Sequence, residues 1–182
     1  NVPGLKKMDN GFFLKEICDD LRKSGYTPNV KILDATEFGV PQKRERIFIV
    51  ASKHGVAFDF PLGEFKDNPV TVGEAFCDLP ELKNGSIEPK LKYPKPALSG
   101  YAKSLRGKKR VVTQNYVTKN SKTVVERYEH INQGNNWQDI PLELMRNYKD
   151  HSRCHSSIYR RLAEDKPAVI IANYRKSMLI HP

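Results

Sequence analysis

The sequence is poor in cysteine and contains no long apolar stretch. Its three cysteines, Cys18, Cys77 and Cys154, are odd in number and widely spaced, which argues against a disulfide framework and favours a reducing cytoplasm. No apolar run approaches the roughly 20 residues that cross a bilayer, and no signal peptide opens the chain. We therefore expect a cytoplasmic location and no membrane partner. Because residue 1 is Asn1 rather than methionine, we expect a cut or processed N-terminus.

Positive charge is concentrated in one segment in the middle of the chain. Between Lys83 and Arg127, twelve lysines and arginines stand against two glutamates, so this segment alone accounts for the net charge of +10. A local basic excess is typical of polyanion binding, although a loop kept soluble by its lysines gives the same pattern. The basic candidates for polyanion contact are Lys103, Arg106, Lys108, Lys109, Arg110, Lys119 and Lys122.

The hydrophobic pattern predicts an α/β portion over residues 1–80, followed by an irregular basic portion over residues 81–182. The expected elements are helices over residues 12–23, 126–133 and 141–148 and strands over residues 29–35, 46–51 and 168–172. The strand at 46–51 is the more apolar and is expected to be buried on both faces. Thr71 and Glu74 predict a capping box before a short helix that ends at Pro80. The basic segment is expected to form short strands and long loops.

The residues that begin the second strand have the most informative pattern. Gln42, Arg44 and Arg46 alternate, so their side chains are expected on one face of the strand. Amide and guanidinium donors beside a buried strand suit a phosphate or the edge of a base. A charged strand end held by surface ion pairs is the alternative.

This run resembles the Gln-x-Arg-x-Arg signature of the DNA cytosine-5 methyltransferases, their motif VIII. Other segments resemble further motifs of the family, in the family's order. Asn1–Leu5 resembles the end of motif VI, and Thr71–Pro80 resembles the segment after motif VIII. The approach to motif IX is resembled by His155–Leu162, Asp165–Ala168 and His181–Pro182. Residues 83–127 match no motif and occupy the interval of the family's variable target-recognition region. The resemblance therefore covers both ends of the chain.

The resemblance implies the edge of a doubly wound, Rossmann-like α/β sheet plus a small, irregular, mostly β and loop target-recognition domain. The partner would be double-stranded DNA, from which a cytosine is flipped before its C5 is methylated. By resemblance, Arg46 would hold the flipped cytosine near its O2 and Arg44 would support the site or a phosphate. Gln42 belongs to the same signature, and Asn1 would order the loop beside a glutamate that this chain lacks.

Two departures from the family concern the catalytic nucleophile and the cofactor. No cysteine follows a proline, as the family's nucleophile does, and no glycine-rich turn leads from a strand to a helix. S-adenosylmethionine is thus expected in the complete enzyme and no cofactor in this chain alone, which we expect to be inactive. The catalytic portion would be encoded in frame upstream or supplied as a separate chain. A non-enzymatic nucleic-acid-binding module is the alternative. The motifs encoded upstream would show whether the chain is part of one enzyme, part of a split enzyme or such a binding module.

The amide-rich loop near residue 134 and the histidines after residue 150 are further candidates. Gln133, Asn135 and Asn136 carry side chains that hydrogen-bond base edges, and Arg153 is a further candidate for DNA contact. Trp137 is expected to anchor the core rather than to stack on a base. Although His151, Cys154 and His155 have ligand spacing, a single cysteine without a second pair does not favour zinc, so no metal is expected.

Overall fold

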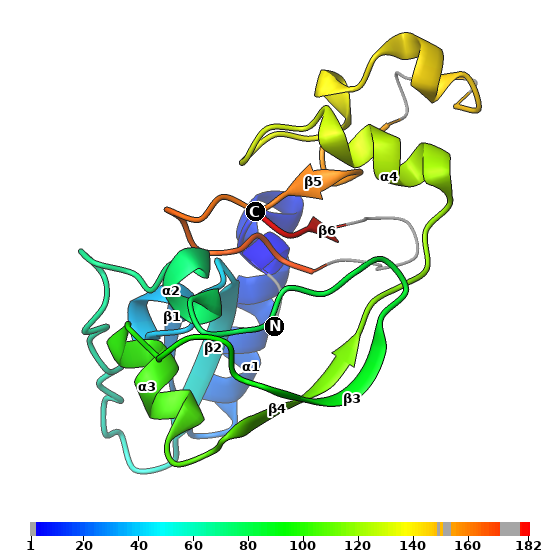
Figure 1. Cartoon of the computed structure of the whole chain (residues 1–182). Coiled ribbons are helices and arrows are strands. Elements are labelled where there is room, and N and C mark those ends of the chain that lie inside the picture. The colour runs from blue at the N-terminus through cyan, green and yellow to red at the C-terminus, as the bar shows by residue number, and fades with distance from the viewer. Residues whose placement is uncertain (1–2, 149, 151–153, 172–178) are drawn as a thin grey trace. The chain divides into compact units, whose positions relative to one another are not determined.

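The computed structural model describes residues 3–148, 150, 154–171 and 179–182 (Figure 1). The chain divides into two compact units, Asn1–Pro69 and Val70–Pro182. The division falls earlier than the boundary predicted at residue 80, so the helix capped by Thr71 belongs to the same unit as the basic segment. In the described ranges, no helix is both long enough and apolar enough to span a membrane.

The first unit contains one helix and a two-stranded antiparallel sheet. Its elements are the 3-10 helices η1 (Pro3–Lys6), η2 (Met8–Gly11) and η3 (Ala35–Phe38), the helix α1 (Phe12–Lys23) and the strands β1 (Thr27–Asp34) and β2 (Glu45–Ser52). The apolar spacing predicted α1 with both of its ends, and it predicted both strands. The strands pair in a register that sets Ile32 opposite Ile47 and Leu33 opposite Arg46.

The two faces of β2 differ strongly in burial. Ile47 is 2% exposed, whereas the next residue, Phe48, is 41% exposed. Successive side chains of a strand point to opposite faces, so only one face of β2 is covered. The prediction that this strand is buried on both faces is therefore wrong for the described residues, because two strands and one helix cannot enclose it. Phe13 on α1 is likewise 46% exposed.

The second unit consists of short elements joined by long loops. Its elements are the helices α2 (Val72–Phe76), α3 (Gly100–Arg106) and α4 (Lys122–Glu129), the 3-10 helices η4 (Trp137–Asp139) and η5 (Leu142–Met145), and the strands β3 (Ile87–Lys92), β4 (Val111–Tyr116), β5 (Arg160–Arg161) and β6 (Leu179–Ile180). Strands β3 and β4 pair antiparallel, and β5 and β6 pair parallel. The short strands predicted for the basic segment are confirmed.

Side-chain caps fix where the helices of the second unit begin. The predicted capping box is confirmed: Thr71 Oγ1 accepts from the Glu74 N–H at 3.2 Å, and Glu74 Oε2 accepts from the Thr71 N–H at 2.9 Å. Ser99 caps α3 by accepting from the Ala102 N–H at 2.9 Å. Ser121 caps α4 in the same way, so this helix begins earlier than predicted. It ends at Glu129 rather than at the predicted residue 133. Helix α3 was not predicted.

The core of the second unit lies between α4 and the elements that follow it. Its buried residues are Ile131, Ile140, Met145, Tyr159 and Ile180, and Trp137 packs against them. The expected role of Trp137 as a core anchor is thereby confirmed. The prediction of a helix over 141–148 is wrong: the chain forms only the single 3-10 turn η5 there, preceded by the extended Pro141 (ψ 138°). The strand predicted over 168–172 is a single bridge at Ala168 within its described part, and residue 172 lies outside the described residues.

Candidate functional site

A carboxylate at the end of β1 positions the backbone of the predicted arginine motif. Asp34 Oδ1 accepts from the Thr36 N–H at 3.1 Å and from the Arg44 N–H at 3.0 Å. The Ala35 N–H in turn donates to the Arg44 carbonyl at 3.1 Å. Burial raises the pKa of Asp34, but the N–H donors of Arg44 and Thr36 outweigh it, so the pKa lies below its usual value. The ionised carboxylate thus holds the N–H of Arg44, and the Ala35 N–H holds its carbonyl.

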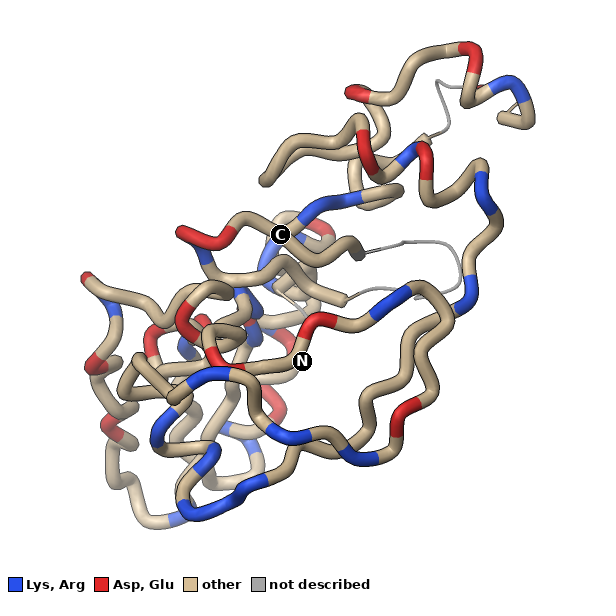
Figure 2. Tube along the Cα trace, in the orientation of Figure 1, with Lys and Arg blue, Asp and Glu red and all other residues tan. Residues whose placement is uncertain are grey.

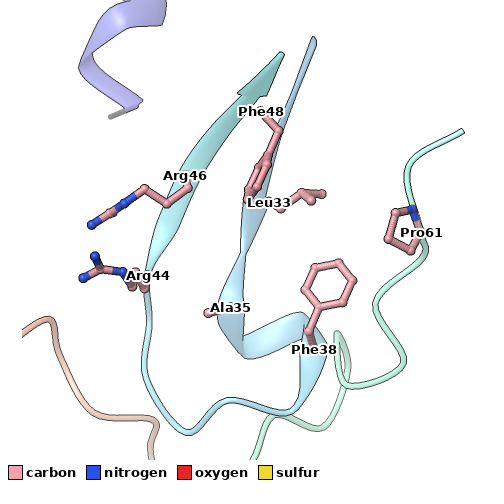
Figure 3. A pocket seen from close by; sticks show the side chains of 7 residues that line it. All are labelled: Leu33, Ala35, Phe38, Arg44, Arg46, Phe48 and Pro61. Atoms are coloured by element: carbon pink, nitrogen blue, oxygen red, sulfur yellow. The ribbon is translucent and has the colours of Figure 1, made fainter. Parts of the chain in front are cut away.

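Arg44 and Arg46 border a pocket of about 350 Å³ on the open side of the sheet (Figure 3). The other lining residues are Leu33, Ala35, Phe38, Phe48 and Pro61. Figure 3 shows both guanidinium groups projecting from the same side of β2, as alternation predicts. Arg46 Nη1 donates to the carbonyl of Glu45 at 2.6 Å. In the described part of the chain neither guanidinium forms an ion pair, so both retain donors for a ligand.

The rest of the motif lies near this pocket without lining it. Gln42 is half-buried, and its N–H donates to Val40 at 2.7 Å. The loop that carries Pro61 is held against η3 by a hydrogen bond of 3.0 Å from the Phe65 N–H to the Glu37 carbonyl. A Cβ at Gly63 would lie 2.4 Å from the Cβ of Glu37, so this close approach requires glycine. Asn1 lies outside the described residues.

In the second unit, lysines and arginines of the basic segment lie along β3, α3 and the turn before β4 (Figure 2). Lys103 lies on α3, and Lys108, Lys109 and Arg110 form the turn that leads into β4. These four residues are all exposed. Strand β3 adds Lys90 and Lys92, which are exposed as well. This part of the unit presents positive charge that pairs with no carboxylate among the described residues, which suits a phosphate backbone.

Two arginines of the basic segment are engaged inside the second unit. Arg106 forms an ion pair with Asp78 at 3.4 Å. Arg127 is 5% exposed and donates to the Leu144 carbonyl at 2.8 Å and to the Tyr159 hydroxyl at 2.7 Å. The net charge of the basic segment includes both arginines, but contacts within the folded unit hold both side chains.

The remaining basic and amide candidates lie in loops and at helix starts. Lys119 is exposed in the loop before α4, and the exposed Lys122 begins α4. The other candidates, Gln133, Asn135 and Asn136, form hydrogen bonds within their own loop or to a neighbouring one. The side-chain oxygen of Gln133 accepts from the Glu164 N–H, and that of Asn136 accepts from the Gln138 N–H. The side-chain amide of Asn135 donates to a carboxylate oxygen of Asp139. Arg153 lies outside the described residues.

The described residues provide neither a metal cluster nor a cofactor loop. No group of three or more His, Cys, Asp and Glu is placed to hold an ion there, and His151 falls outside the described ranges. Strand β1 leads into η3, which is Ala-Thr-Glu-Phe and not a glycine-rich turn. The described residues do not fit S-adenosylmethionine.

Sequence reasoning missed two carboxylates that organise these sites. Asp34 and Asp78 hold Arg44 and Arg106, respectively, in place. Asp34 is separated from Arg44 by a turn, and its place at a strand end before Thr36 is a signal for such a cap. Asp78 and Arg106 are 28 residues apart, and no local pattern in the sequence connects them.

The chain matches the model of the family "C-5 cytosine-specific DNA methylase" over residues 1–177, and it belongs to that family. It is 33% identical over 178 residues to the Type II methyltransferase M.BbvI of Brevibacillus brevis, covering 94% of this chain and 39% of that protein. It is 45% identical over 69 residues to the Type II methyltransferase M.HaeII of Haemophilus aegyptius, covering 37% of this chain and 22% of that protein. The chain thus spans less than half the length of these curated relatives.

A solved structure shares the fold. It is described as a DNA modification methyltransferase encoded within a prophage (E. coli), and it superposes with a TM-score of 0.63 at 20% sequence identity. The match covers 93% of this chain and 50% of that one. The α/β fold class predicted from the sequence, the edge of a Rossmann-like sheet with a small irregular domain, is confirmed.

Proposed function

We propose that this chain is the part of a DNA cytosine-5 methyltransferase that holds the flipped cytosine and recognises the target DNA. The complete protein would transfer a methyl group from S-adenosylmethionine to C5 of that cytosine. The observation that carries the proposal is that Arg44 and Arg46, which form no ion pair among the described residues, both border an apolar pocket. An apolar pocket with a few polar groups at its edge is a usual form of site for a planar, polar ligand such as a base. Here the guanidinium groups project beside the pocket, away from Phe38 and Pro61 (Figure 3).

The described geometry fits the two roles in different degrees. Arg46 belongs to β2, is half-buried and lines the pocket together with Phe48. Arg44 precedes the strand and is exposed, which suits a phosphate on the outer side of the base. Guanidinium donors that are already positioned lose little freedom when the base arrives. We therefore assign the base to Arg46 and a supporting contact to Arg44.

The target DNA would be held by the exposed basic residues of the second unit. Lys103, Lys108, Lys109 and Arg110 carry charge that no carboxylate of the described residues neutralises. Such contacts release counterions, so affinity falls steeply as salt rises. The catalytic cysteine and the cofactor loop would be supplied by polypeptide outside these 182 residues, and we propose that these residues alone do not methylate DNA.

The test uses the full natural polypeptide that contains this chain. Arg46→Ala is expected to lower kcat for methyl transfer into duplex DNA by roughly 100-fold or more, since one preorganised donor contributes that much in comparable sites. Its Kd for the duplex should change less than about threefold, because phosphate contacts dominate affinity. Arg22→Ala, at an exposed ion pair on α1, is the matched control and should leave both values unchanged. Full turnover by Arg46→Ala would refute the role of Arg46.

Methyl-transfer activity distinguishes the proposed function from the alternative, a non-enzymatic DNA-binding module. A natural polypeptide that binds duplex DNA but transfers no methyl group, alone or with a neighbouring gene product, would be a non-enzymatic DNA-binding module. Transfer that appears only on adding the neighbouring product would identify a split enzyme.

A further inference from the structure

Arg106 connects four segments of the second unit through one side chain. Its Nη1 lies 3.4 Å from Asp78 Oδ2 and donates to the Lys95 carbonyl at 2.8 Å. Its Nε donates to the Lys109 carbonyl at 3.4 Å, and its guanidinium lies 4.1 Å from the centre of the Tyr93 ring. The group therefore joins the end of α2, the loop after β3, α3 and the turn before β4.

The carboxylate in this cluster is buried and the arginine is largely covered. The side chain of Asp78 is 4% exposed and that of Arg106 is 23% exposed. A carboxylate leaves water only when a partner compensates it, and Arg106 is the ion-pair partner that the structure gives it. The two residues thus restrict one another, unlike the exposed pairs on α1, whose side chains remain in solvent.

The turn that Arg106 holds carries three adjacent cations. Gly107 ends α3 with φ 51° and ψ −125°, a conformation that favours glycine. Its N–H donates to the Lys103 carbonyl, and the Lys109 N–H donates back to the Arg106 carbonyl. Residues 107–110 form what we term the basic turn, in which Lys108, Lys109 and Arg110 are exposed. The side chain and carbonyl of Arg106 therefore bind the basic turn at the same point.

We infer that Arg106 is a positioning residue, which holds the basic turn in the shape that meets DNA, and that Asp78 holds Arg106. The inference rests on the proposed function. It assigns Arg106 a different role from the phosphate contact that its charge alone suggests. A turn that is already ordered binds DNA without first losing conformational freedom, whereas a loose turn loses it on binding.

The direction in which Asp78→Asn changes the Kd for DNA distinguishes a positioning role of Arg106 from an effect of charge alone. Asp78→Asn and Glu88→Gln each remove one negative charge from the same unit, and Glu88 is exposed on β3. If charge alone mattered, both variants would bind duplex DNA more tightly. A positioning role requires Asp78→Asn to raise Kd by about fivefold or more, while Glu88→Gln lowers it slightly. Arg106→Lys keeps the charge but loses the planar stacking on Tyr93, so it should weaken binding as well.

The experiment uses the full natural polypeptide and has two readouts. Limited trypsin digestion reports order in the basic turn without DNA: Asp78→Asn and Arg106→Lys are expected to be cut there at least about fivefold faster than the natural protein. Fluorescence anisotropy with a labelled duplex, over a range of KCl concentrations, then reports Kd and its salt slope. Lys108→Ala should reduce the slope by about 1, whereas Asp78→Asn should leave the slope unchanged while raising Kd. Measuring each variant well below its unfolding midpoint excludes an effect of stability alone.

Each result decides one statement. Unchanged cleavage of the basic turn in both variants overturns the positioning role, as does Asp78→Asn binding as tightly as Glu88→Gln. A natural protein with no salt-dependent affinity for duplex DNA overturns the proposed function, and the role in DNA binding with it, while the trypsin result still tests the contact itself. If circular dichroism shows Asp78→Asn to be unfolded, the charge-preserving Arg106→Lys gives the decision.

Discussion

Replacing Arg127 by methionine should destabilise the second unit more than any exposed substitution. The Arg127 guanidinium is buried and donates to the Leu144 carbonyl, to the Tyr159 hydroxyl and to Asn147 Oδ1. Of these acceptors, Asn147 is exposed and can bond to water. The Tyr159 hydroxyl can rotate, which leaves the carbonyl of Leu144 as the acceptor that loses its partners.

The magnitude follows from these contacts. Hydrogen bonds from an ionised donor contribute about 1.5–3 kcal/mol each, and a buried acceptor left alone costs about 1–3 kcal/mol. Removing a buried cation also removes its own desolvation cost, which offsets part of the loss. We therefore expect Arg127→Met to lower the free energy of unfolding by about 2–4 kcal/mol, a large fraction of the roughly 5–15 kcal/mol typical of a domain. Tyr159→Phe should cost about 1–1.5 kcal/mol.

The assay is urea unfolding of the natural polypeptide followed by tyrosine and tryptophan fluorescence. Trp137 packs against the core of the second unit and reports on its unfolding. With a slope of about 1–3 kcal/mol per M urea, the midpoint of Arg127→Met should fall by roughly 1–2 M. Arg146→Met, at an exposed arginine nearby, is the matched control and should change stability by less than about 0.5 kcal/mol. An Arg127→Met variant as stable as this control would refute the reasoning.

Three further predictions concern the cap of α2, a tyrosine and the turn before β2. Thr71→Ala removes the capping box and should cost about 1 kcal/mol in thermal unfolding, with a smaller loss for Thr71→Ser. Burial, with the hydrogen bond and charge of Tyr159, raises the pKa of Tyr148 from 10.0 to about 12. This contribution to stability is present below pH 10 and is lost as pH rises through 12, so Tyr148→Phe should flatten the unfolding midpoint measured over that range. Asp34→Ala releases the backbone of Arg44 and should lower turnover by roughly 10- to 100-fold, with DNA affinity nearly unchanged; equal turnover would exclude that role.

Patterns carried by neighbouring residues were predictable. The apolar spacing of α1, the alternation before β2 and the Thr71–Glu74 capping box are all local, because helix and strand periods and caps depend on residues a few positions apart. The ordered motifs also indicated the family, which the comparison confirmed over residues 1–177. The charge excess located the basic segment for the same reason, since composition is a property of the segment itself.

Features that depend on distant residues came only from the tertiary structure. The burial of β2 on one face, the pocket beside Arg44 and Arg46 and the partners of Arg127 all require knowing which segments pack together. Asp78 and Arg106 are 28 residues apart. The net charge of the sequence includes this arginine whether its side chain faces DNA or a buried carboxylate. The sequence by itself thus determined the family, the local elements and where charge lies along the chain. The folded chain decided which charges remain available, because desolvation and pairing depend on three-dimensional neighbours.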